Sequence, residues 1–132
     1  MHLYPIHRVH SSGLRGTLAG VTLAPGVYCF TAAATLTGKL TLNGPVNGIW
    51  IFKIGTGGTG ALTATNFSVV MAGGGQMNNV YWRVTDAVTM TDSILQGTIL
   101  AGRGTTITRG SLVGRALSKG AVTMTNTHIH SF

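Results

Sequence analysis

The side chains that most often carry out catalysis are scarce in this chain. Among its 132 residues there are two carboxylates, Asp86 and Asp92, and each lies at the end of a strand-like segment, where aspartate is common in turns. Hydrolysis of a glycoside would need two carboxylates that act together. Position 92 recurs in a repeated phrase as Arg109 and Asn126, so an acid is not required there. We therefore do not expect an enzyme.

A histidine pair near the C-terminus is the second candidate for chemistry. His128 and His130 form a His-x-His pattern, which can supply two ligands to a metal ion. Zinc sites use three or four ligands held by supporting hydrogen bonds, and no cysteine or acid lies nearby in the sequence. We expect a solvated tail at this position, with no metal site and no cofactor.

The most regular pattern is a repeated pair of threonines. AVTMTD at 87–92 and AVTMTN at 121–126 share five of six positions, and GTTITR at 104–109 lies halfway between them, so the phrase recurs with a constant 17-residue step. LTATN at 62–66 repeats the pattern outside that step. The threonines concerned are Thr63, Thr65, Thr89, Thr91, Thr106, Thr108, Thr123 and Thr125.

Short strands must position these threonines. The chain has 44% hydrophobic and 8% charged residues, with 20 glycines, 20 threonines and no glutamate, which favours strands joined by tight turns over a helical bundle. In a strand, alternate side chains point to opposite faces. Met90, Ile107 and Met124 therefore face inward when the paired threonines face outward.

The constant step predicts a β-solenoid, in which equivalent residues stack on neighbouring coils about 4.8 Å apart. A step of this length suits three short strands with turns, and thus a triangular coil. A βαβ fold would need a helical crossover, but the intervening segments are strand-like and punctuated by glycine. A sandwich of hairpins would explain the strands but not the constant step. Because the distance from LTATN to AVTMTD does not fit the 17-residue step, we expect an insertion or a chain jump upstream.

Six segments, in this order, resemble the microbial ice-binding (antifreeze) proteins: VTLAPGVYCF, LTGKLTLNG, GIWIFKIG, GGGQMNNVYWRV, QGTILAG and VGRALSKGAVTMTNT. The resemblance runs from about residue 16 to residue 130. It implies an all-β, right-handed, triangular and discontinuous β-solenoid, which in the family is flanked by a long helix. It also implies that one flat face binds ice, and that the protein is extracellular or bound to the cell surface.

Threonine suits a surface that binds ice, because it offers a hydroxyl and a methyl group on a stiff stem. Two threonines in a Thr-x-Thr strand are about 6.6 Å apart, and stacking repeats them about every 4.8 Å. The eight threonines named above are therefore the candidate ice-binding face. The rival face passes through Ser93, Ser111 and His128. A third hypothesis is a structural or adhesive module that keeps the fold without ice activity.

The family's N-terminal coil and long helix have no counterpart in the short segment before residue 16, for which we expect an extended or poorly ordered structure. Residues 16–132 would form the solenoid domain. Without the helix, the segments NVYWRV, GTILA and GRALS would expose apolar side chains: Tyr81 or Trp82, one of Ile99 and Leu100, and Leu117. Such a patch usually marks an interface. We therefore expect a homo-oligomer or a filament formed through this uncovered side, or through the open ends of the solenoid.

The net charge of +7 raises nucleic acid as a partner. Its nine basic residues are scattered along the chain, whereas a nucleic-acid footprint is usually a cluster. We do not expect nucleic acid as a partner. No apolar run is long enough to cross a bilayer, so we expect no membrane span, and no signal peptide is visible in the chain.

Overall fold

The computed structural model describes residues 17–130, and within this range the chain forms strands, one short 3-10 helix and no α-helix. The expectation of an all-β fold is confirmed. The expected N-terminal segment, residues 1–15, lies outside the described residues. The elements are β1 (Thr22–Leu23), β2 (Gly26–Phe30), β3 (Ala34–Asn43), β4 (Trp50–Ile54), β5 (Leu62–Ala72), η1 (Met77–Asn79), β6 (Val80–Val84), β7 (Val88–Thr91), β8 (Ile94–Ala101), β9 (Thr105–Ser118) and β10 (Val122–His130).

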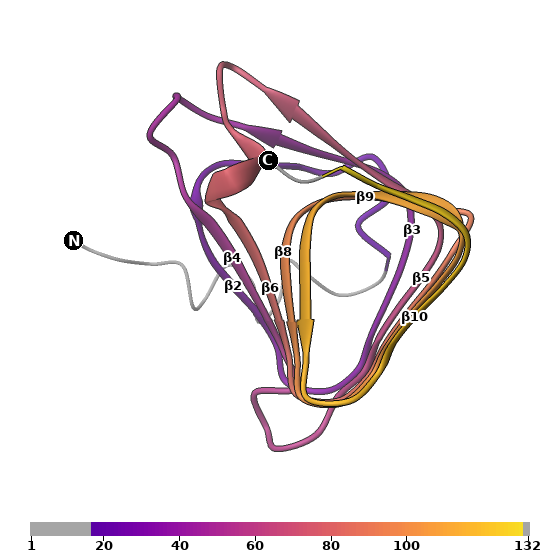
Figure 1. Ribbon diagram of the computed structural model, residues 1–132. Helices are drawn as coiled ribbons and strands as arrows, with labels where there is room; N and C mark the ends of the chain where they lie inside the picture. The colour runs from indigo at the N-terminus through magenta and orange to yellow at the C-terminus, as the bar shows by residue number, and fades with distance from the viewer. Residues whose placement is uncertain (1–16, 131–132) are drawn as a thin grey trace.

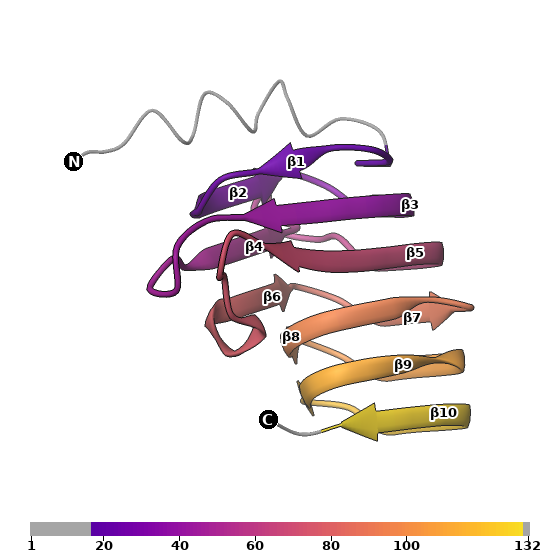
Figure 2. The ribbon, with the colours of Figure 1, turned by 90° about the horizontal axis from the view of Figure 1, so that it is seen from above.

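All pairings among the described strands are parallel, and together they form a stack of coils. Figure 1 looks along the stack and shows the chain winding repeatedly around the same three sides. Figure 2 shows the strands stacked from β1 and β2 at one end to β10 at the other.

We number the three sides by the strand segments that form them. Side 1 consists of 34–36, 62–65, 88–91, 105–108 and 122–125. Side 2 consists of 22–23, 38–43, 67–72, 94–96, 110–113 and 127–130. Side 3 consists of 26–30, 50–54, 80–84, 98–101 and 115–118.

The pairing register explains why the sequence repeat is clear only in the C-terminal half. Val88, Thr105 and Val122 are successive partners, which reproduces the 17-residue step of the sequence. Upstream, Leu62 pairs with Val88 and Ala34 with Leu62, so these steps are longer. The extra residues lie in the loops between strands. Within the described residues the coils follow chain order, so an insertion and not a chain jump interrupts the repeat.

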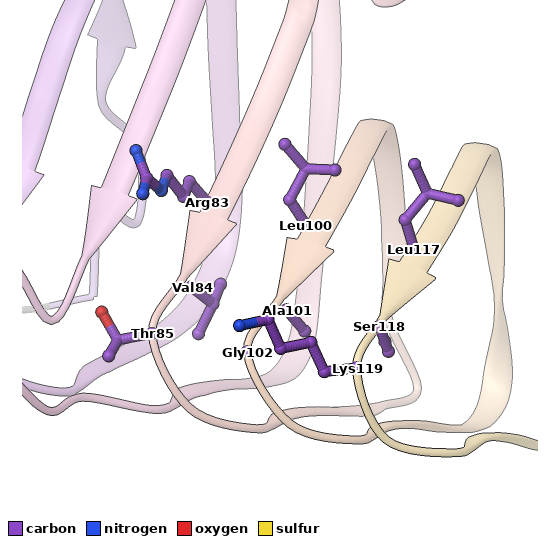
Figure 3. A pocket seen from close by; sticks show the side chains of 9 residues that line it. All are labelled: Arg83, Val84, Thr85, Leu100, Ala101, Gly102, Leu117, Ser118 and Lys119. Atoms are coloured by element: carbon purple, nitrogen blue, oxygen red, sulfur yellow. The ribbon is translucent and has the colours of Figure 1, made fainter.

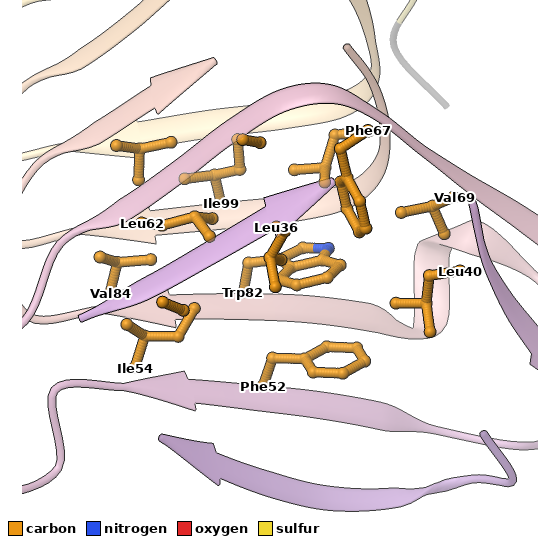
Figure 4. Close-up of a cluster of buried hydrophobic side chains, with 14 of the residues drawn as sticks. Leu36, Leu40, Phe52, Ile54, Leu62, Phe67, Val69, Trp82, Val84 and Ile99 are labelled. Carbon is orange, nitrogen blue, oxygen red and sulfur yellow. The ribbon is translucent and has the colours of Figure 1, made fainter. Parts of the chain in front are cut away.

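The interior of the stack is filled by columns of apolar side chains. Tyr28, Phe52 and Trp82 are register partners on side 3, and their rings stack with centroid distances of 5.6 and 4.1 Å. Phe67 from β5 meets the Trp82 ring edge-on. Figure 4 shows Phe52, Trp82 and Phe67 among the aliphatic side chains around them. Offset and edge-on aromatic pairs add to the stabilisation from buried area, so this cluster anchors the coils to one another.

Two stacked glycines allow the chain to turn from side 2 to side 3 within a strand. Gly97 of β8 pairs with Gly114 of β9, with φ values of 117° and 148°. A Cβ atom on Gly114 would collide with the carbonyl oxygen of Gly97. This corner therefore requires glycine, both for its backbone conformation and for the close approach of the two coils.

Candidate functional site

Side 1 carries two columns of threonine hydroxyls. Successive register partners place one threonine per coil in each column, because every coil presents the same strand parity outward. The first column is Thr35, Thr63, Thr89, Thr106 and Thr123, and the second is Thr65, Thr91, Thr108 and Thr125. Neighbouring strands lie about 4.8 Å apart, and residues two apart in a strand lie about 6.7 Å apart. The hydroxyls thus form a two-dimensional array.

The alternate residues of the same segments hold this array in place. Ala64, Met90 and Ile107 point inward and are fully buried, so β5, β7 and β9 are each anchored to the core between their two threonines. Thr91 and Thr108 are half-buried, whereas the other threonines of the two columns are exposed. The side-1 segments contain no charged residue. The surface between the corners is therefore uncharged, and its β-branched side chains are stiff.

A column of left-handed residues marks the corner between side 1 and side 2. Asn66, Asp92, Arg109 and Asn126 have φ values of 49°, 52°, 52° and 50°. Asparagine and aspartate tolerate this conformation better than most residues, which explains three of the four positions. These corners end side 1 at an equivalent place in four successive coils.

An ion pair joins two of these corners across neighbouring coils. The Arg109 guanidinium donates from Nε and Nη2 to the two carboxylate oxygens of Asp92, at 2.9 and 3.1 Å. These hydrogen bonds lower the pKa of Asp92 below its ordinary value. Both side chains are solvent-exposed, so the pair links two coils at the edge of side 1 without burying charge, and its contribution to stability is small.

All eight threonines named from the sequence lie together on side 1, in adjacent register. The sequence interpretation missed Thr35, which pairs with Thr63. The segment ATLT at 34–37 repeats the apolar-Thr-apolar-Thr phrase and could have indicated it. It was hidden because its distance from the next phrase is set by a loop and not by the 17-residue step.

The rival face expected on side 2 is less uniform than side 1. Ser93 is wrongly assigned to an outer surface, because it is buried: its hydroxyl donates to the carbonyl of Thr91 and accepts from the backbone N–H of Phe67. Ser111 is half-buried and His128 is exposed, and the register column that they share also contains Lys39, Ser68 and Ile94. Side 2 thus presents no column of a single side-chain type along these coils.

Side 3 exposes part of the apolar set expected from the sequence. Tyr81, Leu100 and Leu117 point outward, with exposed fractions of 36%, 38% and 56%. Trp82 and Ile99 are fully buried in the core, so Tyr81 and Leu100 are the outward members of the two pairs named from the sequence, and an interface role for Trp82 or Ile99 is wrong. The physical reason is strand parity, since Trp82 and Ile99 are register partners in the inward column.

The remaining polar groups form no metal centre among the side chains that the structure describes. Asp86 accepts from Arg103 Nε at 3.3 Å and from the backbone N–H of Gly60 at 2.8 Å, which fits a structural role at a corner. No three His, Cys, Asp or Glu residues with described side chains lie close enough to share a metal ion; the His130 side chain lies outside this set. Nor does any helix within 17–130 have the length and apolarity to cross a bilayer.

Comparison with known proteins gives a consistent set of matches. The Ice-binding-like family model matches residues 5–130. An ice-binding protein of Flavobacterium frigoris (strain PS1) is 33% identical over 111 residues, which are 83% of this chain and 39% of the relative. One of Nostoc sp. (strain HG1) is 42% identical over 113 residues, which are 81% of this chain and 40% of the relative.

Two solved structures of ice-binding proteins are similar to this chain over most of its length. An ice-binding protein of Shewanella frigidimarina superposes with a TM-score of 0.80 at 30% identity, over 88% of this chain and 51% of the other. An ice-binding protein with antifreeze activity from an Arctic yeast gives 0.82 at 31% identity, over 89% and 50%. The chain therefore spans about two fifths of the length of these curated relatives and about half of these solved chains.

Proposed function

The chain belongs to the ice-binding-like family, and from this premise we propose that it adsorbs to ice through the threonine columns of side 1. The observation that carries the proposal is the register of Thr63, Thr89, Thr106 and Thr123 on four adjacent parallel strands. The relatives and solved neighbours named above are ice-binding proteins, which supports the same conclusion.

Adsorption to ice needs a surface that holds water in a fixed lattice, and it needs no bond-making step. Each threonine hydroxyl can donate and accept a hydrogen bond, while its methyl group contacts the water cage from the side. One such contact is weak, but the array repeats it in two directions. Because the strands are pinned by their buried residues, little conformational entropy is lost when ice is bound.

We extend the proposal to the finer architecture. We take the solenoid to be triangular and right-handed, as crossover connections between parallel strands nearly always are, and its C-terminal coils to follow the 17-residue step. We propose residues 16–132 as its one domain. By family resemblance the protein acts outside the cell or at the cell surface, without catalysis.

A structural, self-associating module is the second candidate, and one observation favours it. Among the described strands, β10 pairs only with β9, and its inward residues Val122, Met124 and Ile129 are 37%, 47% and 40% exposed. Their register partners Ile107 and Leu112 are fully buried. An open strand edge with exposed apolar side chains can dock a second copy or extend a filament.

A bulky substitution in the middle of the array separates the two candidates. We expect Thr106→Tyr to abolish ice shaping and thermal hysteresis, because the ring would stand above the flat surface, while the exposed site leaves the fold intact. Melting monitored by circular dichroism checks the fold. If ice crystals kept the habit produced by the unmodified chain, side 1 would not be the ice-binding surface.

A further inference from the structure

The corner column between side 1 and side 2 changes its chemistry in the middle of the stack. Its four members, Asn66, Asp92, Arg109 and Asn126, share a left-handed backbone conformation and are all exposed. The outer two carry short, uncharged amides, whereas the inner two form the ion pair that joins neighbouring coils. Charge and side-chain length therefore distinguish the corners of β7 and β9 from the equivalent corners of β5 and β10.

The exposure of the second threonine column follows this change. Each of its threonines comes directly before a corner residue in the chain, and all four occupy equivalent register positions. Thr91 and Thr108, which precede the ion pair, are half-buried. Thr65 and Thr125, which precede the asparagines, are exposed. The column is thus least accessible where the corner is charged.

A charged corner opposes adsorption to ice for a physical reason. Charged side chains hold hydration shells of their own, and giving up that water costs free energy. The amide of asparagine, in contrast, is uncharged and can both donate and accept hydrogen bonds, as a threonine hydroxyl does. The hydrogen bonds between Arg109 and Asp92 leave the two side chains 56% and 41% exposed, so the pair remains hydrated. It therefore disturbs the order of water beside the threonine columns.

We propose that the Asp92–Arg109 pair sets the boundary of the ice contact at this corner, and that Asn66 and Asn126 extend the contact beyond the second column. This inference rests on the proposed function, because it assigns residues to the edge of the same surface. Ice meets a third hydrogen-bonding group in the coils of β5 and β10, and only the two threonines in the coils of β7 and β9. The ion pair thus limits the area that each molecule engages.

The test replaces both charges with the residue that the column itself uses. In the double variant Asp92→Asn, Arg109→Asn, all four corners carry asparagine, which tolerates the left-handed conformation better than arginine does. We expect thermal hysteresis at equal protein concentration to rise about twofold or more, because added weak contacts change binding by small factors. Urea unfolding should give a midpoint no lower than that of the unmodified chain, since the ion pair is exposed.

The opposite edge of side 1 supplies a matched control. Figure 3 shows Thr85, Gly102 and Lys119 in the turns that follow three successive strands of side 3. Asp86 and Arg103 come next in the first two of these turns and form an ion pair across the same 17-residue spacing. They lie three residues from the nearest threonine of the columns, and not beside one. Asp86→Asn, Arg103→Asn should therefore leave thermal hysteresis unchanged.

A single substitution tests the boundary in the other direction. Thr125 is the register partner of Thr108, so Asn126→Asp places a carboxylate at the corner next to Arg109. Aspartate tolerates the same backbone conformation as asparagine. We expect Asn126→Asp to lower thermal hysteresis, because the charged stretch then covers three corners. This variant decides the question if the double variant does not fold, and an unchanged value would overturn the inference.

Thr106→Tyr, measured alongside, separates this inference from the proposed function. If Thr106→Tyr abolishes thermal hysteresis while Asp92→Asn, Arg109→Asn leaves it unchanged or lowers it, side 1 binds ice but the ion pair is not its boundary. An equal rise in Asp86→Asn, Arg103→Asn would also overturn the inference, because removal of any ion pair would then have the same effect. Full activity of Thr106→Tyr would refute the proposed function and the inference together.

Discussion

At the scale of single residues, the corner ion pair between Asp92 and Arg109 makes the stability of the fold depend on pH. Because hydrogen bonds from Arg109 lower the Asp92 pKa in the folded state, the pair stabilises the fold above the unfolded pKa of about 3.9. That contribution is lost as the pH falls through the lower, folded pKa. We expect Arg109→Gln to raise the Asp92 pKa toward its ordinary value in a titration followed by NMR. Arg103→Gln, at a different corner, should leave it unchanged; an Asp92 pKa insensitive to Arg109→Gln would contradict this account.

The residue types on side 3 show how far the sequence alone can predict which face of a strand points outward. In VYWRV at 80–84 two large aromatic residues of opposite parity, Tyr81 and Trp82, are neighbours, so hydrophobicity alone did not decide which of them faces outward. Arg83 shares the parity of Tyr81, and a charged residue belongs outside. That signal predicts the observed burial pattern of β6, with Trp82 inside. The pairing of Lys53 with Arg83 on the same side could not be predicted, because it depends on the register between two residues that lie far apart in the chain.

At the scale of strands, the aromatic column on side 3 should dominate stability. Trp82 is fully buried and stacks on Phe52, so Trp82→Ala should lower the free energy of unfolding by about 3–5 kcal/mol. Tyr81→Ala, one residue earlier on the same strand but outward, should lower it by about 0.5 kcal/mol. Urea unfolding of the two variants measures the difference. Equal losses would mean that the inward and outward faces of β6 are not as described.

The strands of side 1 were the most predictable part of the molecule. A fixed 17-residue step sets the register of β7, β9 and β10, and alternation within each phrase sets which residues face outward. Upstream, loops of different lengths separate β3 from β5 and β5 from β7, so equal spacing no longer identifies equivalent residues. Thr35 was missed for this reason, although its local phrase is the same.

At the scale of the whole molecule, β10 is the last strand of the described stack and the edge at which we propose self-association. If the open end docks a second copy, Met124→Lys should shift sedimentation or light scattering toward monomer, because a charge would replace an exposed apolar contact. Leu117→Lys is the matched control on side 3 and should leave the mass unchanged. A larger effect of Leu117→Lys than of Met124→Lys would place the contact between copies on side 3.

The central claim is that side 1, and not side 2, meets ice. The most direct measurement compares Thr106→Tyr with Ser111→Tyr, two substitutions on β9 that introduce the same ring into the same coil on adjacent sides. Each purified variant is allowed to partition into a slowly growing ice surface alongside the unmodified chain. We predict that Ser111→Tyr is incorporated like the unmodified chain and that Thr106→Tyr is left in the liquid. Exclusion of Ser111→Tyr with normal incorporation of Thr106→Tyr would contradict the account.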